Sequence, residues 1–257
     1  MVYVRELTPK VPRFDPIELA RLTESIVCKR VGTRVARKYT HFKVVKFYGG
    51  VATGFVVGCN LRCFFCWSPP SRDYPERYGR FYTPEEVVNT LVKLMKSVGG
   101  DRVRISGGEP TISREHLVQV LELIEARSDI RLFILETNGI LLGYDRSYVK
   151  ELSRFRDKVV VRVSLKAGTP EKFSERTGAK PNYFELPFRA IRWLLDEGVE
   201  TYVAVMTDPR LMTREERRML FSLLTGIDPK LPLEVEEESI EFFPQTRRRL
   251  RLAGIEL

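Results

Sequence analysis

The 257-residue sequence has few cysteines and histidines, four and two respectively. Four cysteines are too few for a disulfide framework in a chain of this length. Three of them lie within residues 59–66, which favours metal binding in a reducing compartment. No apolar run reaches the roughly 18 residues that a membrane span requires, and the first residues lack the charged-then-apolar order of a secretory signal. These absences predict a cytoplasmic protein without a membrane segment.

Positive charge is in excess. Lys and Arg outnumber Asp and Glu by 43 to 34, which gives a formal net charge of +9. A basic surface attracts acidic proteins and polyanions, so charge alone is compatible with a nucleic-acid partner without proving one. The basic run at residues 247–251 belongs to this excess, and we interpret it as a solvated helix face.

Six apolar segments, separated by amphipathic helical segments, follow residue 51. Most are rich in Val, Ile or Phe, as expected for strands of a parallel sheet that is covered on both faces. Helices are expected to begin between them, because Thr83 and Thr213 each precede a glutamate by three residues, the spacing of a capping box. The expected strands cover residues 53–57, 102–106, 131–136, 159–164, 201–206 and 233–243.

This pattern predicts an α/β fold, and on its own it allows a partial TIM-like barrel, (β/α)6, or a doubly wound sheet. In both folds the carboxyl ends of the parallel strands form the site, and the first four expected strands end in polar or glycine-rich residues. We expect a barrel domain over residues 51–257 and an N-terminal extension, residues 1–50, packed on it. The extension should hold a helix over residues 16–30 and a strand over residues 41–48.

Cys59, Cys63 and Cys66 form a Cys-x3-Cys-x2-Cys loop that supplies three thiolates and no obvious fourth. Structural zinc sites normally take four protein ligands, whereas three thiolates on a 4Fe-4S cluster leave one iron open. A zinc site completed by Cys28, His41 or an acidic side chain is the alternative. Zinc ligands usually come two and two, so the spacing favours the cluster. Cys28 is interpreted as a buried free thiol on the N-terminal helix.

The cysteine loop, with Phe65 just before its last cysteine, resembles the cluster loop of the radical S-adenosylmethionine (SAM) enzymes. Residues 107–110 (GGEP) lie about one strand–helix unit later and are similar to the GGE motif of that family. Residues 164–166 (SLK) and 176–178 (RTG) look most like the branch that contains the pyruvate formate-lyase activating enzyme. The resemblance runs from about residue 55 to 207 and implies the open partial barrel rather than the doubly wound sheet.

The resemblance also implies a role for each motif residue. The three cysteines would ligate the cluster and take part in catalysis through it. A second set would hold SAM: Phe65 near the adenine, Gly107 and Gly108 beside the methionine moiety, Glu109 on its ammonium, Pro110 in the same motif, Lys166 on its carboxylate, and Asn138 and Ser164 on the ribose hydroxyls. A solvated lysine and a plain turn are the alternatives for Lys166 and Asn138.

In this family a reduced cluster passes one electron into SAM, and the resulting 5′-deoxyadenosyl radical abstracts hydrogen from the substrate. The resemblance therefore implies a radical SAM oxidoreductase with one cluster, since no cysteine follows Cys66. It also implies a low-potential electron donor such as a flavodoxin or ferredoxin, and a protein substrate of the glycyl-radical type. Modification of RNA or a nucleoside is the alternative substrate class. A non-catalytic zinc or iron–sulfur binding module is the alternative of another kind.

Overall fold

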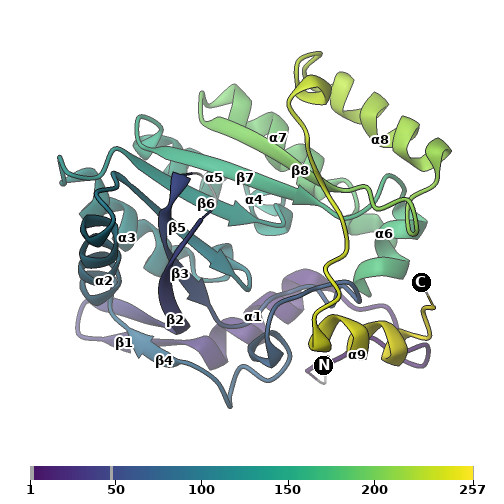
Figure 1. The fold of residues 1–257 in the computed structure, drawn as a ribbon, viewed down its shortest axis with the longest axis horizontal. Coiled ribbons are helices and arrows are strands. Elements are labelled where there is room, and N and C mark those ends of the chain that lie inside the picture. The colour runs from purple at the N-terminus through teal and green to yellow at the C-terminus, as the bar shows by residue number, and fades with distance from the viewer. Residues whose placement is uncertain (1–2, 47–48, 257) are drawn as a thin grey trace.

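The computed structural model describes residues 3–46 and 49–256, and within them nine strands form one sheet (Figure 1). Six of these strands are mutually parallel and follow one another in chain order. A doubly wound sheet reverses its strand order, so the unreversed order confirms the partial barrel, which stays open because β1 and β9 form its two edges. The parallel strands are β3 (Val51–Val56), β5 (Arg102–Gly107), β6 (Leu132–Thr137), β7 (Val159–Leu165), β8 (Glu200–Met206) and β9 (Glu236–Glu238).

Antiparallel strands extend the sheet beyond β3. β2 (Arg34–Val45) pairs with β3, and both β1 (Cys28–Val31) and β4 (Arg80–Tyr82) pair with β2. A two-residue hairpin joins β1 to β2, and its Gly32 has φ +59°, in the left-handed region that glycine adopts without strain. The helix expected over residues 16–30 therefore ends early, and Cys28 lies in a strand and not on a helix.

The helices begin at the expected caps. Thr83 and Glu86 form the predicted capping box of α2. Thr213 caps α8 by accepting from the backbone N–H of Glu216, but the Glu216 carboxylate turns away to pair with Arg176. Within the described residues, no helix is long and apolar enough to cross a bilayer. The helices are α1 (Pro16–Val27), α2 (Pro84–Ser97), α3 (Arg114–Glu125), α4 (Ile140–Tyr144), α5 (Arg146–Leu152), α6 (Pro170–Thr177), α7 (Leu186–Asp196), α8 (Arg214–Thr225) and α9 (Pro244–Ala253).

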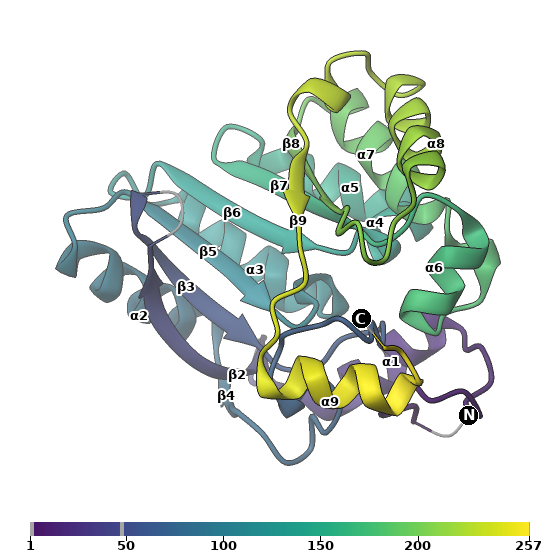
Figure 2. The ribbon, with the colours of Figure 1, turned by 45° about the vertical axis from the view of Figure 1, so that its right-hand side comes forward.

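Two large apolar cores and one small cluster stabilise the described part of the fold. The larger one lies between the sheet and the outer helices, where α2 buries the face that carries Val88 and Leu91. The second core surrounds the cysteine loop, and it packs Phe64 of that loop with Phe14 near the N-terminus and Leu250 of α9. Figure 2 shows α9, near the end of the sequence, close to the N-terminal segment. The loop is thus enclosed by residues from both ends of the sequence.

The last strand is shorter than predicted. Pairing was expected over residues 233–243, but only β9 pairs with β8, and Leu233 before it is 84% exposed. Arg162 on β7 donates to Glu236 and Glu238 at 2.7 and 2.8 Å. Ion pairs therefore hold β9 in place, although the residues of β9 are not apolar. Because the prediction relied on apolar residues, it placed the ends of this strand wrongly.

Candidate functional site

A cavity of about 450 Å³ opens at the carboxyl ends of the parallel strands. Small-molecule sites typically measure about 300–1,000 Å³, so it is large enough for a cofactor or a substrate. Ten of the eleven predicted site residues line it: Cys59, Cys63, Phe65, Cys66, Gly107, Gly108, Glu109, Asn138, Ser164 and Lys166. Pro110 is absent from this lining and begins a short 3-10 helix, η3 (Pro110–Ile112), so its predicted cofactor role stays a prediction.

The three clustered cysteines are free thiols that share this cavity. Within the described residues, no group of three or more His, Cys, Asp or Glu side chains is placed to hold a single metal ion. Cys28 does not line the cavity and packs instead beside Val27 and Val57. Three thiols at a cavity that continues to the glycine motif fit a 4Fe-4S cluster with one open iron, and they do not fit a closed four-ligand zinc site.

The thiols differ in acidity. Burial raises the pKa of Cys59 to about 12 and also raises the pKa of Cys63. Burial acts on Cys66 in the same direction, but Arg72 and Arg249 outweigh it and lower the pKa of that thiol. Metals bind thiolates, so the Cys59 and Cys63 thiols must lose their protons when iron is loaded.

The backbone of the cysteine loop is anchored to the carboxyl end of α6. The N–H groups of Arg62 and Phe64 donate to the carbonyls of Thr177 and Arg176, at 2.9 and 3.1 Å. The Arg176 guanidinium is itself fixed by a buried ion pair, with Nη1 and Nη2 each 2.7 Å from a carboxylate oxygen of Glu216. Residues 176–178, which the sequence analysis singled out for their family resemblance, thus hold the backbone of the cysteine loop in place.

The glycine motif lies directly against the cysteine loop. The Glu109 N–H donates to the Gly58 carbonyl at 2.8 Å, and the Gly108 N–H donates to the Val56 carbonyl at 3.0 Å. A Cβ atom on Gly108 would lie 2.0 Å from the Gly58 oxygen. Gly107 has φ +102°, which other residues rarely adopt. The close approach of two backbone segments therefore requires these glycines, independently of any cofactor.

The Glu109 carboxylate is 1% exposed and links the ends of β5 and β6. Its Oε1 accepts from Thr111 N, Thr111 Oγ1 and Thr137 Oγ1 at 3.0, 2.6 and 2.7 Å. Its Oε2 accepts from Asn138 N at 2.8 Å. A carboxylate oxygen can accept more than one hydrogen bond, so Oε2 retains capacity for a further donor. The predicted contact with the SAM ammonium stays a prediction.

The other predicted SAM residues are held by neighbours. Asn138 Nδ2 donates to Asn60 Oδ1 at 2.8 Å, which fixes the amide beside the cysteine loop. Lys166 donates to Ser164 Oγ, and Ser164 Oγ lies 3.2 Å from Glu238 Oε2. Burial opposes ionisation of Glu238, but Lys166 and Arg162 outweigh it and lower the pKa of its carboxyl. Lys166 is thus half-buried in a polar chain, and its role toward SAM stays a prediction.

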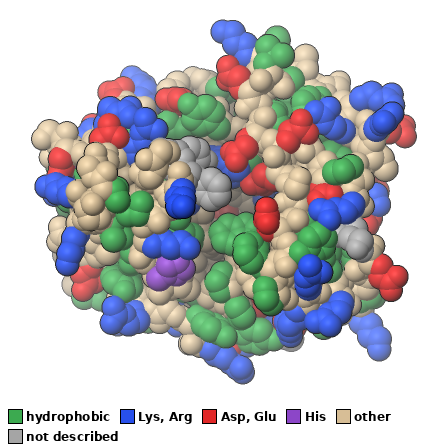
Figure 3. Space-filling model, viewed as in Figure 1, with side chains coloured by type: hydrophobic (Ala, Val, Ile, Leu, Met, Phe, Trp, Pro, Cys, Tyr) green, Lys and Arg blue, Asp and Glu red, His purple; other side chains and the backbone are tan. Residues whose placement is uncertain are grey.

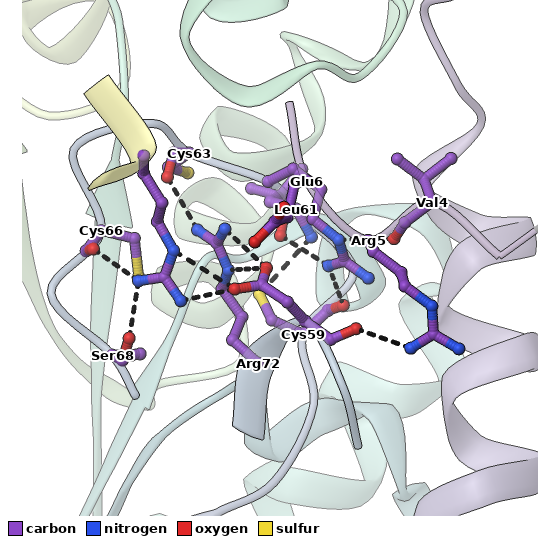
Figure 4. Close-up of polar contacts among 12 residues, drawn as sticks. Val4, Arg5, Glu6, Cys59, Leu61, Cys63, Cys66, Ser68 and Arg72 are labelled. Carbon is purple, nitrogen blue, oxygen red and sulfur yellow. Dashed lines mark hydrogen bonds and ion pairs between the residues drawn. The ribbon is translucent and has the colours of Figure 1, made fainter. Parts of the chain in front are cut away.

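The sequence analysis missed Arg249. We interpreted residues 247–251 as a solvated face, but Arg249 is 3% exposed and its Nη1 donates to the Cys66 and Ser68 carbonyls at 2.7 and 2.6 Å. Thr246, Arg249 and Leu250 are buried together at three- and four-residue spacing, which marks one face of α9. That spacing could have indicated in the sequence that Arg249 lies on the buried face of the helix. Figure 4 shows the polar contacts around Cys66 and Ser68.

Comparison with known families decides between the interpretations of this site. Residues 54–224, more than half of the chain, match the model of the radical SAM superfamily. The chain belongs to the radical SAM superfamily. It is therefore an enzyme that acts by radical chemistry and uses a 4Fe-4S cluster and SAM, as predicted, and the alternative of a non-catalytic binding module is not supported. Radical SAM enzymes generally need a reductant.

Two curated relatives show where the similarity lies. The chain is 35% identical to GTP 3′,8-cyclase of Aquifex aeolicus over 138 residues, which are 51% of this chain and 40% of that enzyme. It is 27% identical to 7-carboxy-7-deazaguanine synthase of Methanothermobacter thermautotrophicus over 191 residues, 70% of each chain. The chain thus spans less than half the length of the Aquifex cyclase. These matches do not support the activating-enzyme branch or its glycyl-radical partner.

Solved radical SAM structures support the fold alone. Native anSMEcpe with bound AdoMet superposes with a TM-score of 0.55 at 22% identity, covering 72% of this chain and 49% of that one. A radical SAM methyltransferase from Sphaerobacter thermophilus gives a TM-score of 0.55 at 15% identity, covering 86% and 66%. Both agree with the partial barrel.

Proposed function

We propose that this radical SAM enzyme abstracts hydrogen from a guanine-derived base or nucleoside. The observation that carries the proposal is that two differently named relatives, GTP 3′,8-cyclase and 7-carboxy-7-deazaguanine synthase, both have a guanine compound in their names. The nucleoside alternative from the sequence analysis therefore has more support than the glycyl-radical partner. When bound, the cluster and SAM supply the radical, and the residues of this chain bind and orient the substrate.

The charge of the cavity favours a base or nucleoside over a triphosphate. A polyphosphate is repelled by an acidic cavity, whereas the N–H groups of a guanine ring find acceptors there. Figure 3 shows acidic side chains near the middle of this face, although the whole chain is basic. Two of the lining carboxylates, Glu136 and Glu237, pair with Arg104 and Arg217 outside the lining. The lining still holds more carboxylates than cations: Glu109, Glu136, Glu236, Glu237, Glu238 and Glu241 against Arg72, Arg162 and Lys166.

The net charge of +9 bears on the partners of the enzyme. A small acidic electron donor, such as a flavodoxin or ferredoxin, is attracted to a basic surface, and this attraction weakens with added salt. An RNA that presents the same guanine base is also attracted. Substrate binding that weakens steeply as salt rises would indicate RNA, because it reports displaced counterions.

The proposal is tested with a substrate panel. Iron-reconstituted enzyme is incubated anaerobically with dithionite, SAM and either guanine, guanosine, GTP or a guanine-containing RNA, and 5′-deoxyadenosine is quantified. We expect guanine or guanosine to increase its formation about tenfold or more over SAM alone, and GTP to do less. Deuterium transfer from a ring- or ribose-deuterated substrate into 5′-deoxyadenosine identifies the abstracted hydrogen. Active enzyme that cleaves SAM at one rate with every panel member would contradict the proposal.

A further inference from the structure

Three buried arginines each hold the backbone carbonyl of one cluster cysteine. Nη1 of Arg62 donates to Cys59 O, Nη1 of Arg72 to Cys63 O, and Nη1 of Arg249 to Cys66 O, each at 2.7 Å. The three side chains are 0%, 2% and 3% exposed in that order. Figure 4 shows polar contacts around the three cysteines and labels Arg72 beside the loop. Hydrogen bonds from a cation are stronger than neutral ones, so the loop is held at every cysteine.

The three arginines come from different parts of the chain. Arg62 is in the loop and is tied to the N-terminal segment, because its Nε donates to Val4 O at 2.7 Å. Arg72 ends the 3-10 helix η2 (Pro70–Arg72), which follows the loop. Arg249 reaches in from α9, more than 180 residues later. The conformation of the loop therefore depends on docking of the C-terminal helix.

Asp73 joins two of these cations. Its Oδ1 accepts from Arg72 Nε at 2.8 Å, and its Oδ2 accepts from Arg249 Nη2 at 2.6 Å. Burial disfavours the charged form of Asp73, but the two guanidinium groups outweigh it and lower the pKa of this carboxyl. At neutral pH the shared carboxylate thus offsets part of the positive charge beside Cys63 and Cys66.

We propose that Arg249 and Asp73 are positioning residues of the cluster loop, and that their opposite charges set the reduction potential of the bound cluster in opposite directions. Reduction adds one negative charge to a cluster, so a nearby buried cation stabilises the reduced state and a nearby anion destabilises it. The Arg249 contacts with Cys66 O and Ser68 O also preserve the loop before iron arrives. This inference rests on membership of the superfamily and is independent of the guanine substrate.

Four variants test it: Arg249→Gln, Arg249→Lys, Asp73→Asn and, as a matched control on an exposed position of α9, Arg251→Gln. Iron and sulfide per chain are measured after anaerobic reconstitution, and the midpoint potential is measured by redox titration followed by electron paramagnetic resonance, without SAM. Circular dichroism of the apoproteins reports folding. We expect Arg249→Gln to lower the potential and Asp73→Asn to raise it, each by about 59 mV, a tenfold change for one electron.

Arg249→Lys separates charge from geometry. A lysine keeps the positive charge, so the potential should stay near that of the natural protein, but one ammonium cannot reproduce the planar guanidinium contacts. Iron loading should therefore fall by about half or more, while Arg251→Gln loads fully. Shifts of the same sign in Arg249→Gln and Asp73→Asn, or potentials equal to the control, would overturn the proposal. If Arg249→Gln fails to fold, the upward shift in Asp73→Asn and the iron loading of Arg249→Lys decide it.

Discussion

Replacing Gly108 with alanine should abolish cluster loading and destabilise the protein by about 3 kcal/mol, the upper range for overpacking. The added Cβ would lie 2.0 Å from the Gly58 carbonyl oxygen and 3.1 Å from that of Val56. Both are backbone atoms, so no side-chain rotation relieves the clash. The hydrogen bonds that join the glycine motif to the cysteine loop must then break, and Cys59 moves with Gly58. Thermal unfolding of the apoprotein and iron content after reconstitution measure the two effects.

Gly226→Ala is the matched control for this substitution. Gly226 has ordinary helical φ of −68°, and an added Cβ would lie 3.5 Å from the Leu223 oxygen. At such a position alanine restricts the unfolded chain and leaves stability unchanged or raises it by a few tenths of a kcal/mol. A Gly108→Ala protein that loads iron fully and unfolds at the temperature of Gly226→Ala would contradict the role of the close backbone contact.

Glu109→Gln should weaken SAM binding about 10- to 100-fold while the protein stays folded. The amide has nearly the shape of the carboxylate, and its oxygen can still accept from Thr111 and Thr137. Its NH2 group leaves only the Asn138 N–H without an acceptor and removes the charge that we expect to meet the SAM ammonium. Hydrogen bonds to charged groups contribute about 1.5–3 kcal/mol, which corresponds to that loss. Equilibrium dialysis of SAM against cluster-loaded protein measures the affinity.

Glu109→Ala is a poorer test, since it leaves the buried donors on Thr111, Thr137 and Asn138 unpaired and destabilises the fold as well. The surface substitution Glu122→Gln on α3 controls for the loss of one negative charge. If Glu109→Gln binds SAM as tightly as Glu122→Gln does, the carboxylate serves only to tie β5 to β6, and the predicted ammonium contact is wrong.

The parts of the site that sequence could predict are local in the chain. The spacing of Cys59, Cys63 and Cys66 alone predicts three metal ligands. Polar residues that follow apolar strands predict the edge of the sheet where the cavity forms. Apart from β9, the other five parallel strands could also be predicted, because strands covered on both faces are largely apolar. The hydrophobic pattern failed at β9, whose three glutamates are held by ion pairs.

Contacts between residues that are far apart in the sequence could not be predicted from a single sequence. Arg249 acts on a carbonyl 183 residues earlier, and a run of arginines usually marks a solvated face. Glu216 occupies the capping-box position, yet its carboxylate pairs with Arg176, 40 residues earlier. The hairpin between β1 and β2 was not predicted, because Gly32 is the only residue in the sequence that indicates a turn there. The apolar periodicity of α1 also continues into β1. In each case a tertiary contact overrides the local pattern.

The most direct test of the account is cleavage of SAM at the three-cysteine loop. Iron-reconstituted protein is incubated anaerobically with dithionite and SAM beside a Cys63→Ala variant, and 5′-deoxyadenosine is measured by chromatography. We predict formation in the natural protein and none above background in the variant, because loss of one thiolate leaves the cluster without its third ligand. A cluster-loaded natural protein that yields no 5′-deoxyadenosine, or a variant that yields as much, would contradict the account.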